Sequence, residues 1–90
     1  MNAISPVLGA PDIIRTIENL LVRAGPYSLW TIGLAVDIRQ ARATRDTSGL
    51  WADWETDGQD AASAVLEHFT RQGMMRDSAS DEQGIHVHIF

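Results

Sequence analysis

The feature that most constrains the fold is the segment 27–36 (YSLWTIGLAV), which is apolar on both of its faces. Its aromatic and β-branched residues favour a strand over a helix. A strand that is apolar on both faces has to be covered from both sides, so we expect it in the centre of a sheet. Gly33 within the segment indicates a bulge or a close approach between this backbone and another part of the chain.

Three segments of the sequence carry helical signals, one before this strand and two after it. We expect helices over 11–24, over 38–46, and from a cap at Asp57 or Gly58 to Gly73. In the first and third helices, apolar residues recur at intervals of three and four. Asp37 is a suitable N-cap for the second helix, and Gly25, followed by Pro26, ends the first.

Two further segments alternate between apolar and polar residues, as half-exposed strands do. In 50–56, one face carries Leu50, Ala52 and Trp54, and the other carries Trp51, Asp53 and Glu55. In 85–90, one face carries Ile85, Val87 and Ile89, and the other carries His86, His88 and Phe90. Residues 74–84 are small and polar, which predicts a mobile loop. Residues 1–10 are expected to form a loose N-terminal arm.

The order α-β-α-β-α-β indicates a single α/β (α+β) domain over residues 1–90, in which helices flank a three-stranded sheet. The connection over 37–49 is just long enough for a crossover, so the strands before and after it can pair in parallel. The last strand can lie antiparallel beside the first. Ninety residues leave no room for a second domain.

The composition excludes several classes of protein. The chain has no cysteine, which excludes disulfide scaffolds, zinc ribbons and thiol enzymes. Its 12 acidic and 7 basic residues give a net charge of −5, which disfavours nucleic acid as a partner. No segment contains the roughly 18 apolar residues that a membrane span requires, and the N-terminus does not resemble a secretory signal. We therefore expect a cytoplasmic protein that does not associate with membranes.

The acidic residues concentrate between Asp46 and Asp60, a stretch without a basic residue. A negative field attracts basic surfaces, so we expect a protein partner with a basic surface to bind there; the alternative is an ordinary solvated surface. In a regular strand the two tryptophans of this stretch point to opposite faces, which leaves one of them as an interface anchor unless helices cover both. The residues expected to bind the partner are Trp51, Asp53, Trp54, Glu55 and Asp57. A homodimer through the sheet edge or an apolar helix face is a further alternative.

His86 and His88 share one face of the last strand, because side chains alternate along a strand. Two imidazoles at this spacing can reach one metal ion, with Glu67 as an oxygen ligand, or one of them can act as a general base. The alternatives are two polar positions on an exposed face, and a surface ion pair between Glu67 and Arg71. A basic ridge on the second helix consists of Arg39, Arg42 and Arg45. This ridge can contact phosphates or an acidic partner, or can be solvated.

Several short motifs resemble the GIY-YIG nuclease domain. Residues 30–33 (WTIG) are similar to the Tyr-Ile-Gly strand of that family, and the arginines of the following helix and Glu67 are similar to its catalytic Arg and metal-binding Glu. The last strand (IHVHIF) resembles the family's first strand, moved to the C-terminus. The resemblance therefore implies a degenerate, circularly permuted GIY-YIG-like domain over residues 27–90. The WTIG motif and the terminal aromatic strand are also similar to those of small uncharacterised bacterial proteins.

Three positions depart from the family pattern. Thr31 stands in place of one tyrosine of the family, and His86 or His88 in place of another. Ala41 stands in place of the catalytic Arg, which Arg42 or Arg39 matches only after a shift of one or two residues. The resemblance is for this reason stronger for the fold than for cleavage of nucleic acid.

These observations give two hypotheses of function. The first is a small acidic, non-enzymatic protein-interaction module without a cofactor; an inhibitor of a nucleic-acid-binding complex, such as an anti-CRISPR protein, has these properties. The second, implied by the resemblance, is a metal-dependent phosphodiesterase. In it, His86 or His88 would be the base, Arg42 would stabilise phosphate charge and Glu67 would hold a divalent metal.

Overall fold

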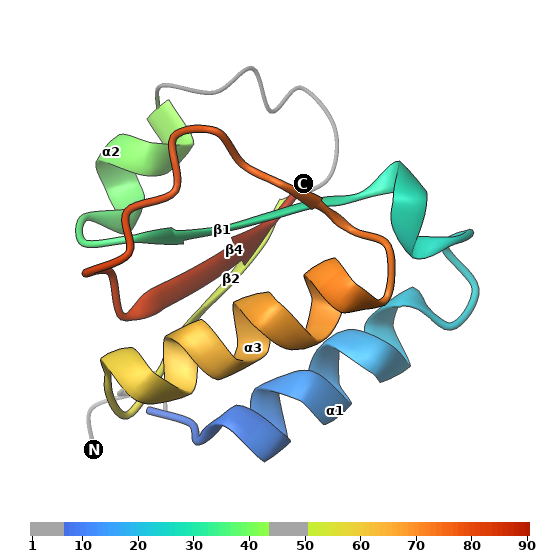
Figure 1. Cartoon of the computed structure of the whole chain (residues 1–90), viewed down its shortest axis with the longest axis horizontal. Helices are drawn as coiled ribbons and strands as arrows, with labels where there is room; N and C mark the ends of the chain where they lie inside the picture. Colours follow the sequence, from blue (N-terminus) through green and yellow to red (C-terminus); the bar gives the residue numbers. More distant parts are fainter. Residues whose placement is uncertain (1–6, 44–50) are drawn as a thin grey trace, which may run out of the picture.

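The computed structural model describes residues 7–43 and 51–90 of the chain. In these residues a four-stranded sheet carries helices α1 and α3 on one face and α2 on the other (Figure 1). The helices are α1 (Ala10–Leu21), α2 (Ile38–Ala43) and α3 (Gln59–Arg71), and the strands are β1 (Thr31–Ala35), β2 (Ala52–Glu55), β3 (Met75–Arg76) and β4 (His86–Ile89). A 3-10 turn over Tyr27–Leu29 precedes β1. The mixed α+β class that the sequence predicts is confirmed.

The strand order is β2-β4-β1-β3, so the expectation of a three-stranded sheet is wrong by one strand. The additional strand, β3, lies within the predicted loop over 74–84. It joins the sheet through backbone groups: the N–H of Met75 donates to the carbonyl of Trp30, and the N–H of Asp77 donates to that of Ile32. A strand of two residues is too short to show a periodic pattern, which is why the sequence does not indicate it.

β4 lies between β1 and β2 and runs antiparallel to both. The predicted antiparallel pairing of the last strand with the first is confirmed, in a register that sets Gly33 opposite His88. The direct parallel pair that the 37–49 connection allowed does not form, because β4 occupies the place between the two strands. β1 and β2 run in the same direction because each is antiparallel to β4, which lies between them.

β1 is covered on both faces, as its composition predicts. Ile32 and Leu34 are buried toward α1 and α3. Gly33 faces the opposite side, where it lies against His88 and Asp77. Both faces of the strand are thus enclosed by protein, and this explains why its sequence shows no alternation between apolar and polar residues.

The core side chains come mainly from the sheet and from α1 and α3, which lie together on one side of the sheet (Figure 1). The buried stripes of these helices have the predicted helical spacing; they consist of Ile13, Ile17 and Leu21 in α1, and of Ala62, Val65, Leu66 and Phe69 in α3. The ring of Tyr27 packs edge-on against Phe69 with 5.5 Å between the ring centroids. This contact attaches the turn before β1 to the core.

Most predicted ends of the elements hold to within three residues, but the strand predicted over 27–36 is wrong at its start, because Tyr27–Leu29 form a 3-10 turn and β1 begins at Thr31. α1 stops at Leu21 rather than at residue 24, and Gly25 follows with a φ of 91°, the left-handed conformation that favours glycine. Asp37 caps α2, because its Oδ1 accepts hydrogen bonds from the backbone N–H groups of Arg39 and Gln40. Residues 44–46 of the predicted second helix lie outside the described residues.

Two segments without long elements are attached to the sheet. Leu8, in the described end of the N-terminal arm, forms a parallel bridge with Thr56. The segment 77–84 follows β1: the N–H of Asp81 donates to the carbonyl of Leu34, and the N–H of Leu34 donates to Ser80 Oγ. Within residues 7–43 and 51–90, no helix has the length and apolar character needed to cross a bilayer.

Candidate functional site

The face of the sheet that carries α2 gathers the polar candidates of the sequence. His86 and His88 of β4 point to this face, and in register they lie opposite Glu55 and Asp53 of β2. The predicted common face of the two histidines is therefore confirmed. Their environments differ: the side chain of His86 is 21% exposed, whereas His88 is completely buried.

His88 lies at the centre of a cluster of rings and carboxylate oxygens. Its Nε2 is 3.1 Å from Asp77 Oδ2. The indole of Trp51 stacks on its imidazole, with 4.9 Å between centroids and 8° between planes, and the Phe90 ring lies 5.8 Å away at 20°. A buried imidazole in contact with a carboxylate and two aromatic rings is a structural residue in this arrangement, since no face of it is open to a substrate.

Gly33 makes room for this cluster. A Cβ atom at position 33 would lie 2.8 Å from His88 Nε2 and 2.9 Å from Asp77 Cβ, closer than side chains tolerate. The ladder between β1 and β4 continues in register through Gly33, so the residue forms no bulge. Of the two roles that the sequence indicates for this glycine, the structure shows the close approach.

His86 has a different partner. Its Nε2 is 3.7 Å from Glu55 Oε1, across the pair formed by β4 and β2. This contact places the Glu55 carboxylate beside His86 on this face of the sheet. His86 therefore belongs with β2 and its acidic residues, not with a metal site shared with His88.

Glu67 lies apart from both histidines. It is on α3, which covers the other face of the sheet, and its Oε2 is 3.7 Å from Arg71 Nη2 in an exposed pair one helical turn apart. The surface ion pair that the sequence offered as the alternative is thus present. Glu67 also lines an open hollow of about 280 Å³ together with Arg76 and Glu82. The sheet separates this hollow from His88.

Arg42 lies exposed on α2, as does Arg39, and Arg45 lies outside the described residues. The structure therefore does not bring Arg42, Glu67 and the two histidines into one cavity. In the described parts of the chain, no group of three or more His, Cys, Asp or Glu side chains is arranged to hold a metal ion.

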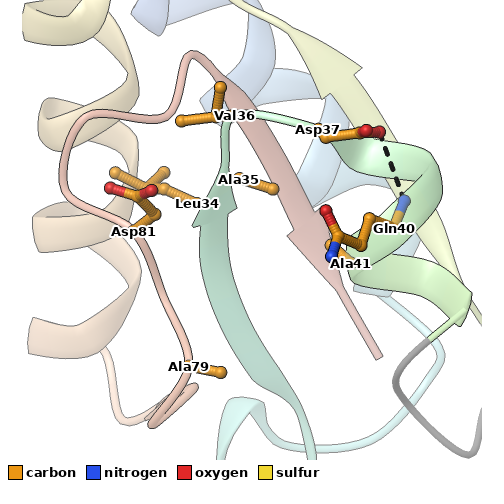
Figure 2. A pocket seen from close by; sticks show the side chains of 8 residues that line it. All are labelled: Leu34, Ala35, Val36, Asp37, Gln40, Ala41, Ala79 and Asp81. Atoms are coloured by element: carbon orange, nitrogen blue, oxygen red, sulfur yellow. Dashed lines mark hydrogen bonds between the residues drawn. The ribbon is translucent and has the colours of Figure 1, made fainter.

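A second hollow, of about 330 Å³, opens between the end of β1, α2 and the segment 77–84 (Figure 2). Its apolar part comes from Leu34, Ala35 and Val36. The carboxylate of Asp37 turns back to its own helix, where it accepts the N–H of Gln40, and Asp81 lies on the opposite side of the hollow (Figure 2). Polar groups do not converge on one point in this hollow, and convergence is what substrate sites require.

The residues predicted to bind a partner lie together at the outer strand of the sheet. Of the five predicted residues Trp51, Asp53, Trp54, Glu55 and Asp57, Trp54 is turned toward the core, and we call the side chains of the other four the β2 surface. The predicted opposite orientation of the tryptophans is confirmed: Trp54 packs against the core, and Trp51 stacks on His88. Both indoles are half-buried, so helices and strands cover part of each.

Charge on the β2 surface is uniformly negative. Asp53 and Asp57 are exposed and Glu55 is half-buried. The indole N–H of Trp51 donates to Asp53 Oδ2 at 2.6 Å, which fixes the position of that carboxylate. The six arginines within the described residues belong to α1, α2, α3, β3 and the turn after α1. None of those six arginines lies on β2.

Sequence reasoning missed Asp77 and Gly84. Asp77 is buried beside His88, and its Oδ1 also accepts the N–H of Ala79. A Cβ atom at Gly84 would lie 2.5 Å from the backbone of Ala35, so only glycine lets this segment close against β1. Both residues stand in a short polar stretch that looks like any surface loop, and nothing local in the sequence marks them.

Comparison with known proteins adds no relative. No protein-family model matches the chain, and neither the curated proteins nor the solved structures give a significant match.

Proposed function

We propose that the protein is a non-enzymatic interaction module that binds a partner with a basic surface through the β2 surface. One observation carries this proposal: Trp51, Asp53 and Glu55 stand on one face of the outer strand and of the residue before it, whereas Arg42 lies on α2, Glu67 lies on α3 and His88 is buried in β4. A binding surface needs its residues on one accessible face, and a catalytic site needs its residues around one cavity.

The physical basis of recognition is charge and aromatic contact. The carboxylates of Asp53 and Glu55 on β2 and of Asp57 just after it, with no arginine on that strand, give a local negative potential that attracts Lys and Arg side chains. Trp51 adds an aromatic group whose indole N–H already holds Asp53. Because this carboxylate is fixed before binding, less side-chain entropy is lost when a cation contacts it.

Proteins that bind nucleic acid present basic surfaces, so an inhibitor of such a complex, of the anti-CRISPR kind, is one protein that this surface would suit.

The degenerate GIY-YIG-like phosphodiesterase is the weaker proposal. The antiparallel pairing of β4 with β1 agrees with a permuted domain of that type. The distance between Glu67 on one side of the sheet and His88 on the other speaks against a common catalytic centre.

Charge reversal tests the interaction module. The probe is a fluorescently labelled peptide rich in Arg and Lys, titrated with the protein at low and at physiological salt. We expect Asp53→Lys with Glu55→Lys to weaken binding by tenfold or more and to flatten its salt dependence, because rim charges on one patch supply most of the attraction.

The matched control is Asp12→Lys with Glu18→Lys, which makes the same change of net charge on α1. If both double variants lose affinity equally, binding follows net charge alone and the assignment to the β2 surface is wrong. Circular dichroism of each variant establishes that it remains folded.

A further inference from the structure

The outer edge of β2 has open backbone groups. In the register with β4, the backbone groups of Ala52, Trp54 and Thr56 turn inward; the N–H of Thr56, for example, donates to the carbonyl of Ile85. Alternate residues of an antiparallel strand turn outward, so the groups of Asp53 and Glu55 face the edge.

Among the described residues, Leu8 occupies one end of this edge. Its N–H donates to the carbonyl of Glu55, and its carbonyl accepts the N–H of Asp57. In the part of the chain that the structure describes, no strand lies beside Asp53, whose N–H and carbonyl are both directed outward, nor beside the N–H of Glu55. Unpaired edge groups of this kind are a template for one more strand.

The two sides of this edge differ in chemistry. On the side of the α2 face stand the carboxylates of Asp53 and Glu55. On the side of α1, next to Ala52 at the start of the strand, an apolar hollow of about 190 Å³ opens between Leu20 of α1 and Trp30. Leu20 is 53% exposed and lines this hollow.

We propose that the partner binds as an additional β-strand along β2, and that its side chains alternate between basic and apolar. The inference rests on the proposed function and specifies how that function is performed. Side chains of an added strand point to alternate faces. Its basic residues would meet Asp53 and Glu55, its apolar residues would cover Leu20 and the hollow beside Ala52, and backbone hydrogen bonds would fix the register.

A second copy of this chain does not fit the same edge. Two copies paired through β2 would bring the carboxylates of Asp53 and Glu55 of each copy close to those of the other, and like charges opposite one another destabilise a strand pair. An extended segment with Arg or Lys at every second position has the complementary charge and the right period.

The test compares three versions of one peptide in which Arg and Val alternate. One is unmodified, and the other two are N-methylated on alternate residues, in the two possible registers. Only one set of amides in a bound strand faces β2, so one methylated peptide is expected to lose at least about tenfold in affinity, the equivalent of one to two hydrogen bonds. The other methylated peptide is expected to bind like the unmodified one.

Two variants separate backbone from charge. Asp53→Asn removes the charge of the side chain and keeps the outward N–H. Asp53→Pro removes the charge and also the outward N–H. It leaves the ladder with β4 intact, because proline is tolerated at an edge position whose N–H faces outward. We expect Asp53→Pro to bind the peptide more weakly than Asp53→Asn does. Circular dichroism and thermal unfolding establish that both variants keep the fold.

Equal affinity of both methylated peptides, together with a loss of affinity in Asp53→Lys with Glu55→Lys, would overturn strand addition and leave the interaction module standing. No binding of the unmodified peptide to the unmodified protein at low salt would overturn both. Sedimentation that reveals dimers lost in Asp53→Pro would also overturn the inference, because the edge would then receive a second copy.

Discussion

Gly33→Ala is the sharpest test of the buried cluster around His88. The added methyl group would lie 2.8 Å from His88 Nε2 and 2.9 Å from Asp77 Cβ, where nonbonded heavy atoms prefer about 3.5–4.0 Å. The imidazole cannot turn aside cheaply, because Asp77 holds its Nε2 and Trp51 stacks on its plane. The backbone of β1 cannot withdraw without loosening the ladder to β4.

The magnitude follows from these contacts. Overpacking a core position costs about 1–3 kcal/mol, and the gain from restricting the unfolded chain by replacing glycine returns about 0.4–1 kcal/mol. With two contacts too short and both neighbours fixed, we expect the free energy of unfolding to fall by about 2 kcal/mol. The total for a domain of this size is roughly 5–13 kcal/mol, so the variant folds but is measurably weaker.

Urea unfolding followed by tryptophan fluorescence and by circular dichroism measures the loss. With an m-value of about 1–2 kcal/mol/M, the midpoint should fall by roughly 1–2 M. Gly9→Ala is the matched control: a Cβ atom there meets Asp57 Oδ2 at an ordinary 3.5 Å and the φ of −75° suits alanine, so the midpoint should move far less.

A double-mutant cycle assigns the cause. In the background of His88→Ala the ring is absent, and Gly33→Ala should then cost at least about 1 kcal/mol less than in the unmodified protein. If Gly33→Ala leaves the midpoint unchanged, or if its cost is the same with and without His88, the close approach at this position has been misjudged and the reasoning fails.

Two further predictions concern the same face and the alternative function. Asp77→Ala removes the carboxylate partner of the buried His88 Nε2, so the free energy of unfolding measured by urea titration should drop by about 1–3 kcal/mol. The control is Asp81→Ala, on the exposed part of the same segment, which should change this free energy little. Equal losses in the two variants would contradict a special role for Asp77. With Mg²⁺ or Mn²⁺ present, the protein should not cleave single- or double-stranded DNA on a gel, because Glu67 and the histidines do not share a cavity; robust cleavage that disappears in Glu67→Ala would restore the nuclease alternative.

Most of the helices and strands are predictable because their patterns are local. The stripe from Ile13 to Leu21 and the alternation from His86 to Phe90 each occur within one segment, and a periodicity of three to four or of two identifies them directly. β3 was not predictable, since its two residues join the sheet through backbone groups that any sequence possesses. Its presence depends on the neighbouring edge of β1, which is distant in sequence.

The candidate site divides in the same way. The common face of His86 and His88 followed from alternation, but the burial of His88 depends on Gly33, Asp77 and Trp51, which come from three different segments. Contacts between segments that are distant in the sequence produce no pattern of residues at a fixed spacing. The acidic stretch was visible in the sequence, whereas its place on an outer strand depended on the insertion of β4 between β1 and β2.

The insertion of β4 also sets the order in which the chain can assemble while it is being made. Ala35 of β1 leaves the ribosome long before its partner His86, and β2 likewise has to wait for residues 86–89. Until then α1 and α3 can form and β1 can pair with β3, but β1 and β2 lack the strand that joins them, and the edges that β4 will occupy remain open to other nascent chains. Synthesis of residues 86–89 thus joins separate pieces into one sheet, which makes this short stretch the step at which misassembly is either avoided or begun.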